Sequence, residues 1–156
     1  LGLEVSDKPE ELESDTLLLN NLLEIMAAEQ VDFTVFWRRL SVAVVESSTE
    51  ASAWRQVADL FLDQAAWQAW QTRYLDRLNQ LDVNQCQGRM YKVNPKYVLR
   101  NHLAESAIQK SKMGDHSEVE TLFKLLKSPY DDQAPFDHYA NLPPAWASSI
   151  EISCSS

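Results

Sequence analysis

Apolar side chains recur at three- and four-residue steps along most of the chain, which is the pattern of amphipathic helices. The first such stretch predicts a helix that begins at Ser14 or Asp15 and runs to about Ala28. The next predicted helix is capped by Asp32 and extends to about Val45. No stretch alternates apolar and polar residues for long enough to predict a strand. The pattern therefore predicts an all-α fold of packed helices.

Two further helices are predicted over residues 53–62 and 63–81. The second places Trp67, Trp70 and Tyr74 on one face. Large aromatic residues at helical spacing usually pack in a core, although the same face could bind a partner protein. Core packing is the favoured interpretation.

The middle of the chain is punctuated by glycine and proline. Residues 82–93 lose the helical period and contain Gly88, so they are predicted to be a connection. Asn94 then suits a helix cap and Pro95 a first helical turn. The helix that they begin is predicted to end at Gly114.

A last helix is predicted from a capping box, in which Ser117 is followed three residues later by Glu120. Pro129 ends this helix. Its predicted buried stripe consists of Val119, Leu122, Phe123 and Leu126. We therefore expect one helical region over residues 1–128.

The remaining residues, 129–156, are rich in proline, aspartate and aromatic side chains and show no sustained period. They are predicted to form an irregular tail that lies across the helices, with one helical turn after Pro143 and Pro144.

Composition and charge exclude several classes of function. The 156 residues carry a formal net charge of −9, which repels phosphate backbones, so nucleic acid is not expected as a partner. No apolar run approaches the roughly 20 residues that span a bilayer, so a membrane is not expected either. Three glycines are too few and too scattered for a phosphate-binding loop. The chain begins at Leu1 rather than Met, and we expect it to be a piece of a longer protein.

Metal-ligating residue types are present but scattered. The histidines do not have the spacing of a metal site, and the acidic residues after Pro129 are better explained as turn residues than as a cation site. We therefore predict no metal site. The residues in question are His102, His116, His138, Asp131, Asp132 and Asp137.

Two cysteines, Cys86 and Cys154, are too few for a disulfide scaffold, which favours a cytoplasmic protein. Cys154 lies close to the C-terminal residue among serines, where an accessible thiol can be oxidised or can exchange with a disulfide. Composition alone favours an incidental cysteine, and spacing does not decide whether the two cysteines pair.

Several runs resemble hallmarks of the selenoprotein O family, and they occur in the family's order. These runs are residues 94–101 (NPKYVLRN), 114–115 (GD), 128–133 (SPYDDQ), 143–147 (PPAWA) and 152–156 (ISCSS). The likeness covers essentially the whole chain and is strongest from about Met90 onward.

The resemblance implies a kinase-like (pseudokinase) fold in a protein about three times this long. Members of the family are described as transferring AMP from ATP to hydroxyl groups of protein substrates, with a divalent metal, Mg or Mn. The chain would then be the C-terminal third, and its partners would be the N-terminal kinase-like segment and the protein substrates.

The resemblance carries no catalytic, cofactor-binding or metal-binding residue over to this chain, because those motifs belong to the preceding segment. Some members have selenocysteine where this chain has Cys154, so the resemblance implies a redox-sensitive residue there. The alternative hypothesis is a stand-alone helical module, without enzymatic activity, that binds another protein through its tryptophan-bearing face.

Overall fold

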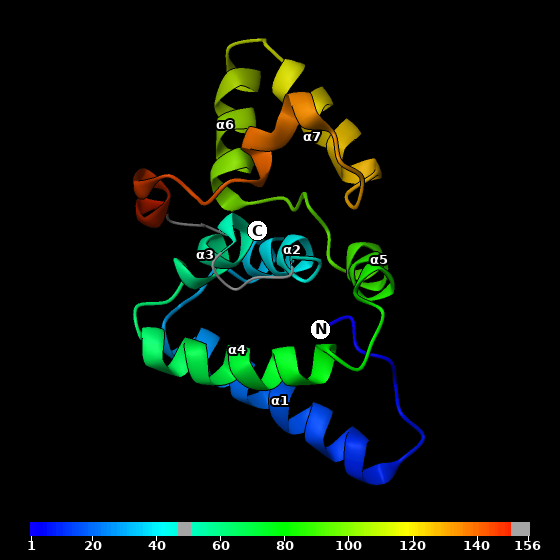
Figure 1. The fold of residues 1–156 in the computed structure, drawn as a ribbon. Helices are drawn as coiled ribbons and strands as arrows, with labels where there is room; N and C mark the ends of the chain where they lie inside the picture. Colours follow the sequence, from blue (N-terminus) through cyan, green and yellow to red (C-terminus); the bar gives the residue numbers. More distant parts are fainter. Residues whose placement is uncertain (47–50, 151–156) are drawn as a thin grey trace. The chain divides into compact units, whose positions relative to one another are not determined.

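The computed structural model describes residues 1–46 and 51–150, and every regular element in this part of the chain is helical (Figure 1). The predicted all-α fold is confirmed. In chain order the elements are α1 (Pro9–Ala28), α2 (Phe33–Ala43), α3 (Ser52–Ala58), α4 (Gln64–Leu78), α5 (Val83–Val93), α6 (Asn101–Lys112), α7 (Ser117–Lys127) and the 3₁₀ segments η1 (Ala134–Ala140) and η2 (Ala145–Ser149). None of the described helices has both the length and the apolar character needed to cross a bilayer.

The chain forms two compact units, the first from Leu1 to Asn94 and the second from Pro95 onward. This division differs from the expected boundary after residue 128. The reason is that the two units have separate hydrophobic cores. From the expected tail, Tyr139 belongs to the second core with residues of α6 and α7, and Phe136 and Ala140 pack against it.

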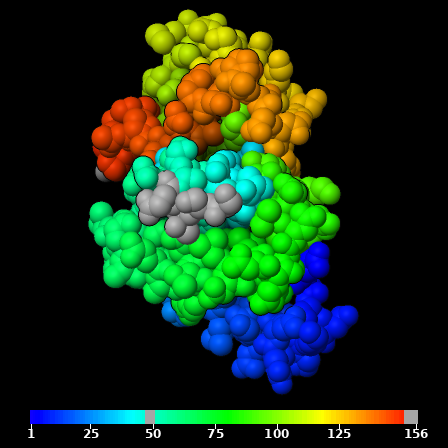
Figure 2. Space-filling model, in the orientation of Figure 1, coloured from blue at the N-terminus to red at the C-terminus, as the bar shows by residue number. Residues whose placement is uncertain are grey.

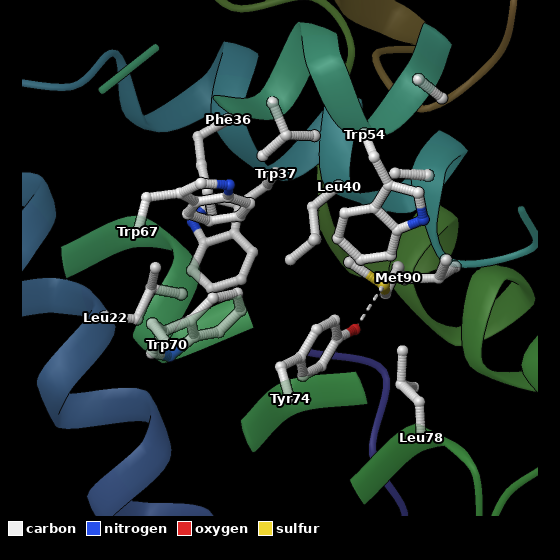
Figure 3. Close-up of a cluster of buried hydrophobic side chains, with 14 of the residues drawn as sticks. Leu22, Phe36, Trp37, Leu40, Trp54, Trp67, Trp70, Tyr74, Leu78 and Met90 are labelled. Carbon is white, nitrogen blue, oxygen red and sulfur yellow. Dashed lines mark hydrogen bonds between the residues drawn. The ribbon is translucent and has the colours of Figure 1, made fainter. Parts of the chain in front are cut away.

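Aromatic rings dominate the core of the first unit. Phe61, Trp67, Trp70 and Tyr74 stack one on the next, with ring centroids 4.7, 5.3 and 4.9 Å apart. Figure 3 shows the α4 rings among leucines from neighbouring helices, with Leu22 on one side. α4 packs against α1, and α2 packs against α3 and α5. Removal of this apolar area from water is the main contribution to the stability of the unit.

Aspartate side chains begin three helices of the first unit. Asp32 accepts a hydrogen bond from the backbone N–H of Val35 at 2.9 Å, which confirms it as the cap of α2. Asp63 and Asp82 cap α4 and α5 in the same way. Each satisfies backbone donors that have no partner within the helix.

The segment after Asp82 is the helix α5, so the predicted connection is wrong. Cys86 and Met90 lie one turn apart and are completely buried in the first core. This burial outweighs the polar residues between them. Gly88 is an ordinary helical position with open space around it.

The first helix begins earlier than predicted. α1 starts at Pro9, not at Ser14 or Asp15, with proline in its first turn and Glu10 and Glu11 beside it. Proline lacks the N–H that a first turn leaves unpaired, and acidic residues favour the positive end of the helix dipole.

The helix predicted to begin at Asn94 begins only at Asn101. The backbone N–H groups of Lys96 and Tyr97 both donate to the carbonyl oxygen of Pro129, which keeps this stretch non-helical. At the other end of α6 the predicted terminator is confirmed, since Gly114 has a φ of +86°.

The predicted capping box is wrong, because Ser117 is the first residue of α7 and not its cap. Asp115 accepts the hydrogen bond from the Ser117 backbone N–H at 3.0 Å. The aspartate two residues before the helix therefore accepts the capping hydrogen bond, in place of the predicted serine.

The predicted buried stripe of α7 is wrong for two of its four residues. Leu122 is buried, whereas Val119 and Phe123 are 47% and 66% exposed. Leu125, outside the predicted stripe, is 1% exposed. The inward side of α7 is therefore rotated from the predicted one.

Between α7 and Ile150, where the described part of the chain ends, the backbone is irregular apart from η1 and η2. Within the second unit, the segment after α7 (orange in Figure 2) covers part of the helices α6 and α7 (olive and yellow). The helical turn predicted after Pro144 is confirmed as η2.

Candidate functional site

The motifs at residues 94–101 and 128–133 are joined by hydrogen bonds. The backbone N–H groups of Lys96 and Tyr97 lie 2.7 and 3.1 Å from the carbonyl oxygen of Pro129. The Tyr97 hydroxyl donates to the carbonyl oxygen of Gln133 at 3.2 Å. Two stretches more than thirty residues apart in the sequence therefore form one local structure.

Lys96 also links these motifs through its side chain. Its Nζ atom lies 2.8 Å from Oδ1 of Asp132 and 2.7 Å from Oδ1 of Asp137. The lysine side chain is 17% exposed, whereas the two carboxylates are 67% and 59% exposed. We call Lys96, Asp132 and Asp137 the lysine clasp.

The clasp keeps Lys96 charged. Burial acts to lower the pKa of the ammonium group, but hydrogen bonds to Asp132 and Asp137 outweigh it, so the pKa is raised. A protonated amine bound by two carboxylates has no lone pair with which to act as a base or nucleophile. The clasp is therefore suited to holding the segment after α7 in place.

A second network joins α6, α7 and η1. The Tyr139 hydroxyl donates to Oε1 of Glu118 at 2.8 Å, and Nζ of Lys110 donates to Oε2 of the same carboxylate at 2.7 Å. Burial and the hydrogen bond to Glu118 raise the pKa of Tyr139 to about 12. Burial acts to raise the pKa of Glu118, but hydrogen bonds from Lys110 and Tyr139 outweigh it and lower that pKa.

Two of the three aspartates after Pro129, which the sequence predicted to be turn residues, bind a lysine side chain. Asp132 and Asp137 bind the ammonium of Lys96, which occupies the position between them. In residues 1–46 and 51–150, no group of three or more His, Cys, Asp or Glu side chains could hold a metal ion. Asp132 and Asp137 therefore have the Lys96 ammonium as their ion-pair partner.

The three histidines lie in separate surroundings. His102 lies edge-on to Trp146, with ring centroids 6.0 Å apart, and its pKa is lowered first by burial and then by the charge of Arg100. His116 lies 3.2 Å from the hydroxyl of Ser111. His138 packs on Tyr139. The structure does not bring the three together.

The tryptophan-bearing face of α4 is core. Trp67, Trp70 and Tyr74 are at most 1% exposed, so the favoured interpretation of core packing is confirmed. The alternative hypothesis of an interaction module required this face to meet a partner, and the burial removes its basis.

The predicted redox residue Cys154 lies outside the described residues. Cys86 is completely buried, and its Sγ atom accepts a hydrogen bond from Nη2 of Arg89 at 3.4 Å. The thiol of Cys86 is thus shielded from solvent, although the sequence placed it in a connection.

Sequence reasoning missed the roles of Lys96, Tyr97, Glu118 and Tyr139. It placed Lys96 and Tyr97 in a helix, and it gave no role to Glu118, which lies between the two residues of the predicted capping box. The available signal for Lys96 and Tyr97 was the presence of two distinctive motifs, at residues 94–101 and 128–133, although only the structure shows that the two are paired.

Comparison with known proteins gives a consistent result. A family model described as protein adenylyltransferase SelO matches residues 1–127. The chain is 50% identical over 142 residues to the protein nucleotidyltransferase YdiU of Albidiferax ferrireducens, which covers 91% of this chain and 28% of that protein. It is 48% identical over 158 residues to the YdiU protein of Burkholderia vietnamiensis, which covers 100% of this chain and 29% of that protein. The chain therefore spans less than a third of the length of these relatives.

Proposed function

The chain belongs to the SelO family of protein adenylyltransferases, and on this premise we propose that it is the C-terminal supporting region of an enzyme that transfers AMP from ATP to hydroxyl groups of proteins. The observation that carries the proposal is the 50% identity to a protein nucleotidyltransferase of which these residues match only 28%. We further propose a cytoplasmic location, because the two cysteines of this chain are too few for a disulfide scaffold.

In this proposal the helices complete a kinase-like domain, while ATP and Mg or Mn are bound by the preceding segment. The described residues do not themselves fit a metal site. The lysine clasp links the segment before α6 to Asp132 and to η1. The ion pair and hydrogen bond of Glu118 link α6, α7 and η1. Their contribution to AMP transfer is to keep this region rigid.

The test uses the complete gene product and the 156-residue chain side by side. Each is incubated with ATP labelled at the α-phosphate, with Mg or Mn, and with protein acceptors. We expect label on protein with the complete product and none with the short chain. A complete product that transfers no AMP under any of these conditions would refute the proposed activity.

Calorimetry tests whether nucleotide binding lies elsewhere. Titration of ATP and magnesium into the short chain is expected to give no binding heat. Micromolar affinity, which corresponds to about −8 kcal/mol, would show that these residues hold the nucleotide after all.

We also propose that Cys154 is a redox-sensitive residue of the parent enzyme. The support is the family resemblance together with the complete burial of Cys86. Iodoacetamide is expected to alkylate Cys154 faster than Cys86 in the native chain, as measured by peptide mass spectrometry. Cys154→Ser provides the control, and equal rates would count against a redox role.

A further inference from the structure

Helix α7 carries two apolar stripes, of which only one is buried. Leu122 and Leu125 face the core of the second unit. Val119 and Phe123 are 47% and 66% exposed, with Leu126 half-buried beside them. Positions 119, 123 and 126 follow the i, i+4, i+7 spacing and therefore share one side of the helix. We call these three residues the outer stripe.

The outer stripe belongs to a unit with little core of its own. The buried core residues of the second unit are Tyr97, Ala107, Leu122, Leu125 and Tyr139. Its exposed large hydrophobic residues are Leu99, Ile108, Met113, Val119, Phe123, Tyr130, Leu142 and Trp146. Among the described residues this unit thus exposes more large apolar side chains than it buries. Exposed apolar surface of this kind marks contact with another protein surface.

Phe123 is held in the helix surface rather than folded back onto the core. Nζ of Lys127, one turn further along α7, lies 5.6 Å from the centroid of its ring. A cation at the edge of an apolar stripe is typical of the rim of a protein–protein interface, where the long stem packs and the charge stays in water.

The length of the relatives indicates what covers the outer stripe. They match 91–100% of this chain, yet these residues make up only 28–29% of each relative. In a protein of that length, more than two thirds of the polypeptide lies outside these residues and is covalently held close to the outer stripe. We propose that Val119, Phe123 and Leu126 dock against an apolar surface of the polypeptide that completes the SelO-family enzyme. This inference rests on the proposed function, in which the chain is one region of a longer protein.

Thiol labelling tests the docking without any need for activity. Phe123→Cys and, separately, Val119→Cys are introduced with Cys154→Ser into both the 156-residue chain and the complete gene product. Glu120→Cys is the matched control, since Glu120 is an exposed residue on the polar side of α7. Labelling rates with a maleimide are read at the α7 peptide by mass spectrometry, which separates these sites from Cys86 and from any other cysteine.

We expect the cysteines at 119 and 123 to react at least tenfold more slowly in the complete product than in the short chain, with equal rates at 120. Equal rates at all three positions would overturn the inference, and so would a gene product no longer than this chain. Slow labelling already in the short chain would also overturn it, because the cover would then be the first unit or, if the rate falls as concentration rises, a second copy. Protection at 119 and 123 in a product that transfers no AMP would uphold the docking while refuting the proposed activity.

Discussion

Replacing Lys96 with methionine removes the charge of the lysine clasp and keeps most of the aliphatic stem. Hydrogen bonds to charged groups contribute about 1.5–3 kcal/mol when they are desolvated, whereas exposed ion pairs contribute about 0.2–1 kcal/mol. The clasp lies between these cases, because the lysine is 17% exposed and its two partners are more than half exposed. We therefore expect Lys96→Met to lower the free energy of unfolding by about 1–2 kcal/mol.

The loss is measured by thermal unfolding at pH 7, where about 2–4 °C accompanies each kcal/mol in a single transition of this size. Lys92→Met is the matched control, since Lys92 is an exposed lysine of α5, and its replacement should change stability by less than about 0.5 kcal/mol. A double-mutant cycle with Asp137→Asn isolates the ion pair, and its coupling energy should fall in 1 M salt. Equal stability of the Lys96 and Lys92 variants, or zero coupling, would refute the role assigned to the clasp.

Three further predictions concern other parts of the fold. Gly88→Ala should stabilise the chain by about 0.5–1 kcal/mol in urea unfolding, because Gly88 is helical with open space around it. Gly114→Ala should destabilise the chain by about 1 kcal/mol, because the φ of Gly114 is +86°. Stability changes of the same sign in both variants would contradict this reasoning. Between pH 10 and 12 a tyrosine of the unfolded chain loses its proton while Tyr139 of the folded chain retains it, so the free energy of unfolding falls in this range. In thermal unfolding, Tyr139→Phe should lose less stability over this range than the parent chain, by on the order of 2 kcal/mol. Parallel curves of stability against pH would argue against the hydrogen bond to Glu118. Asp82→Ala should cost about 1 kcal/mol and speed hydrogen exchange in α5 before other helices, and unchanged exchange there would contradict the capping role.

Local signals in the sequence were sufficient where a helix depends on its own residues. Asp32 was recognised as a cap because a short acidic side chain precedes an apolar period. Gly114 was recognised as a terminator because the left-handed conformation favours glycine. The stacked face of α4 followed from the spacing of its aromatic residues.

Local signals failed where distant residues decide the backbone. Asn94 and Pro95 have the residue types of a helix start, yet the N–H groups of Lys96 and Tyr97 are taken by a carbonyl more than thirty residues away. No window around Asn94 contains that partner. In α5 the polar stretch hid a helix that is stabilised by burial of Cys86 and Met90, which depends on the rest of the first core.

The candidate site was predictable only in outline. The motifs at 94–101 and 128–133 were singled out, but their pairing through Lys96 and Asp132 required the three-dimensional arrangement. For the outer stripe of α7, the sequence and the structure disagree about burial. The sequence predicted Val119 and Phe123 to be buried, whereas this chain leaves them exposed.

The distribution of tryptophans, four in the first unit and one in the second, allows the two units to be followed separately by spectroscopy. Of the five tryptophans, Trp37, Trp54, Trp67 and Trp70 belong to the first unit and Trp146 to the second. The indoles of Trp67 and Trp70 lie 5.3 Å apart at an angle of 30°, close enough for their excited states to couple and to mark the native first unit by circular dichroism. A Trp146→Phe chain would show tryptophan emission from the first unit alone, and its difference spectrum from the parent would report the surroundings of Trp146 in the second unit as the chain unfolds.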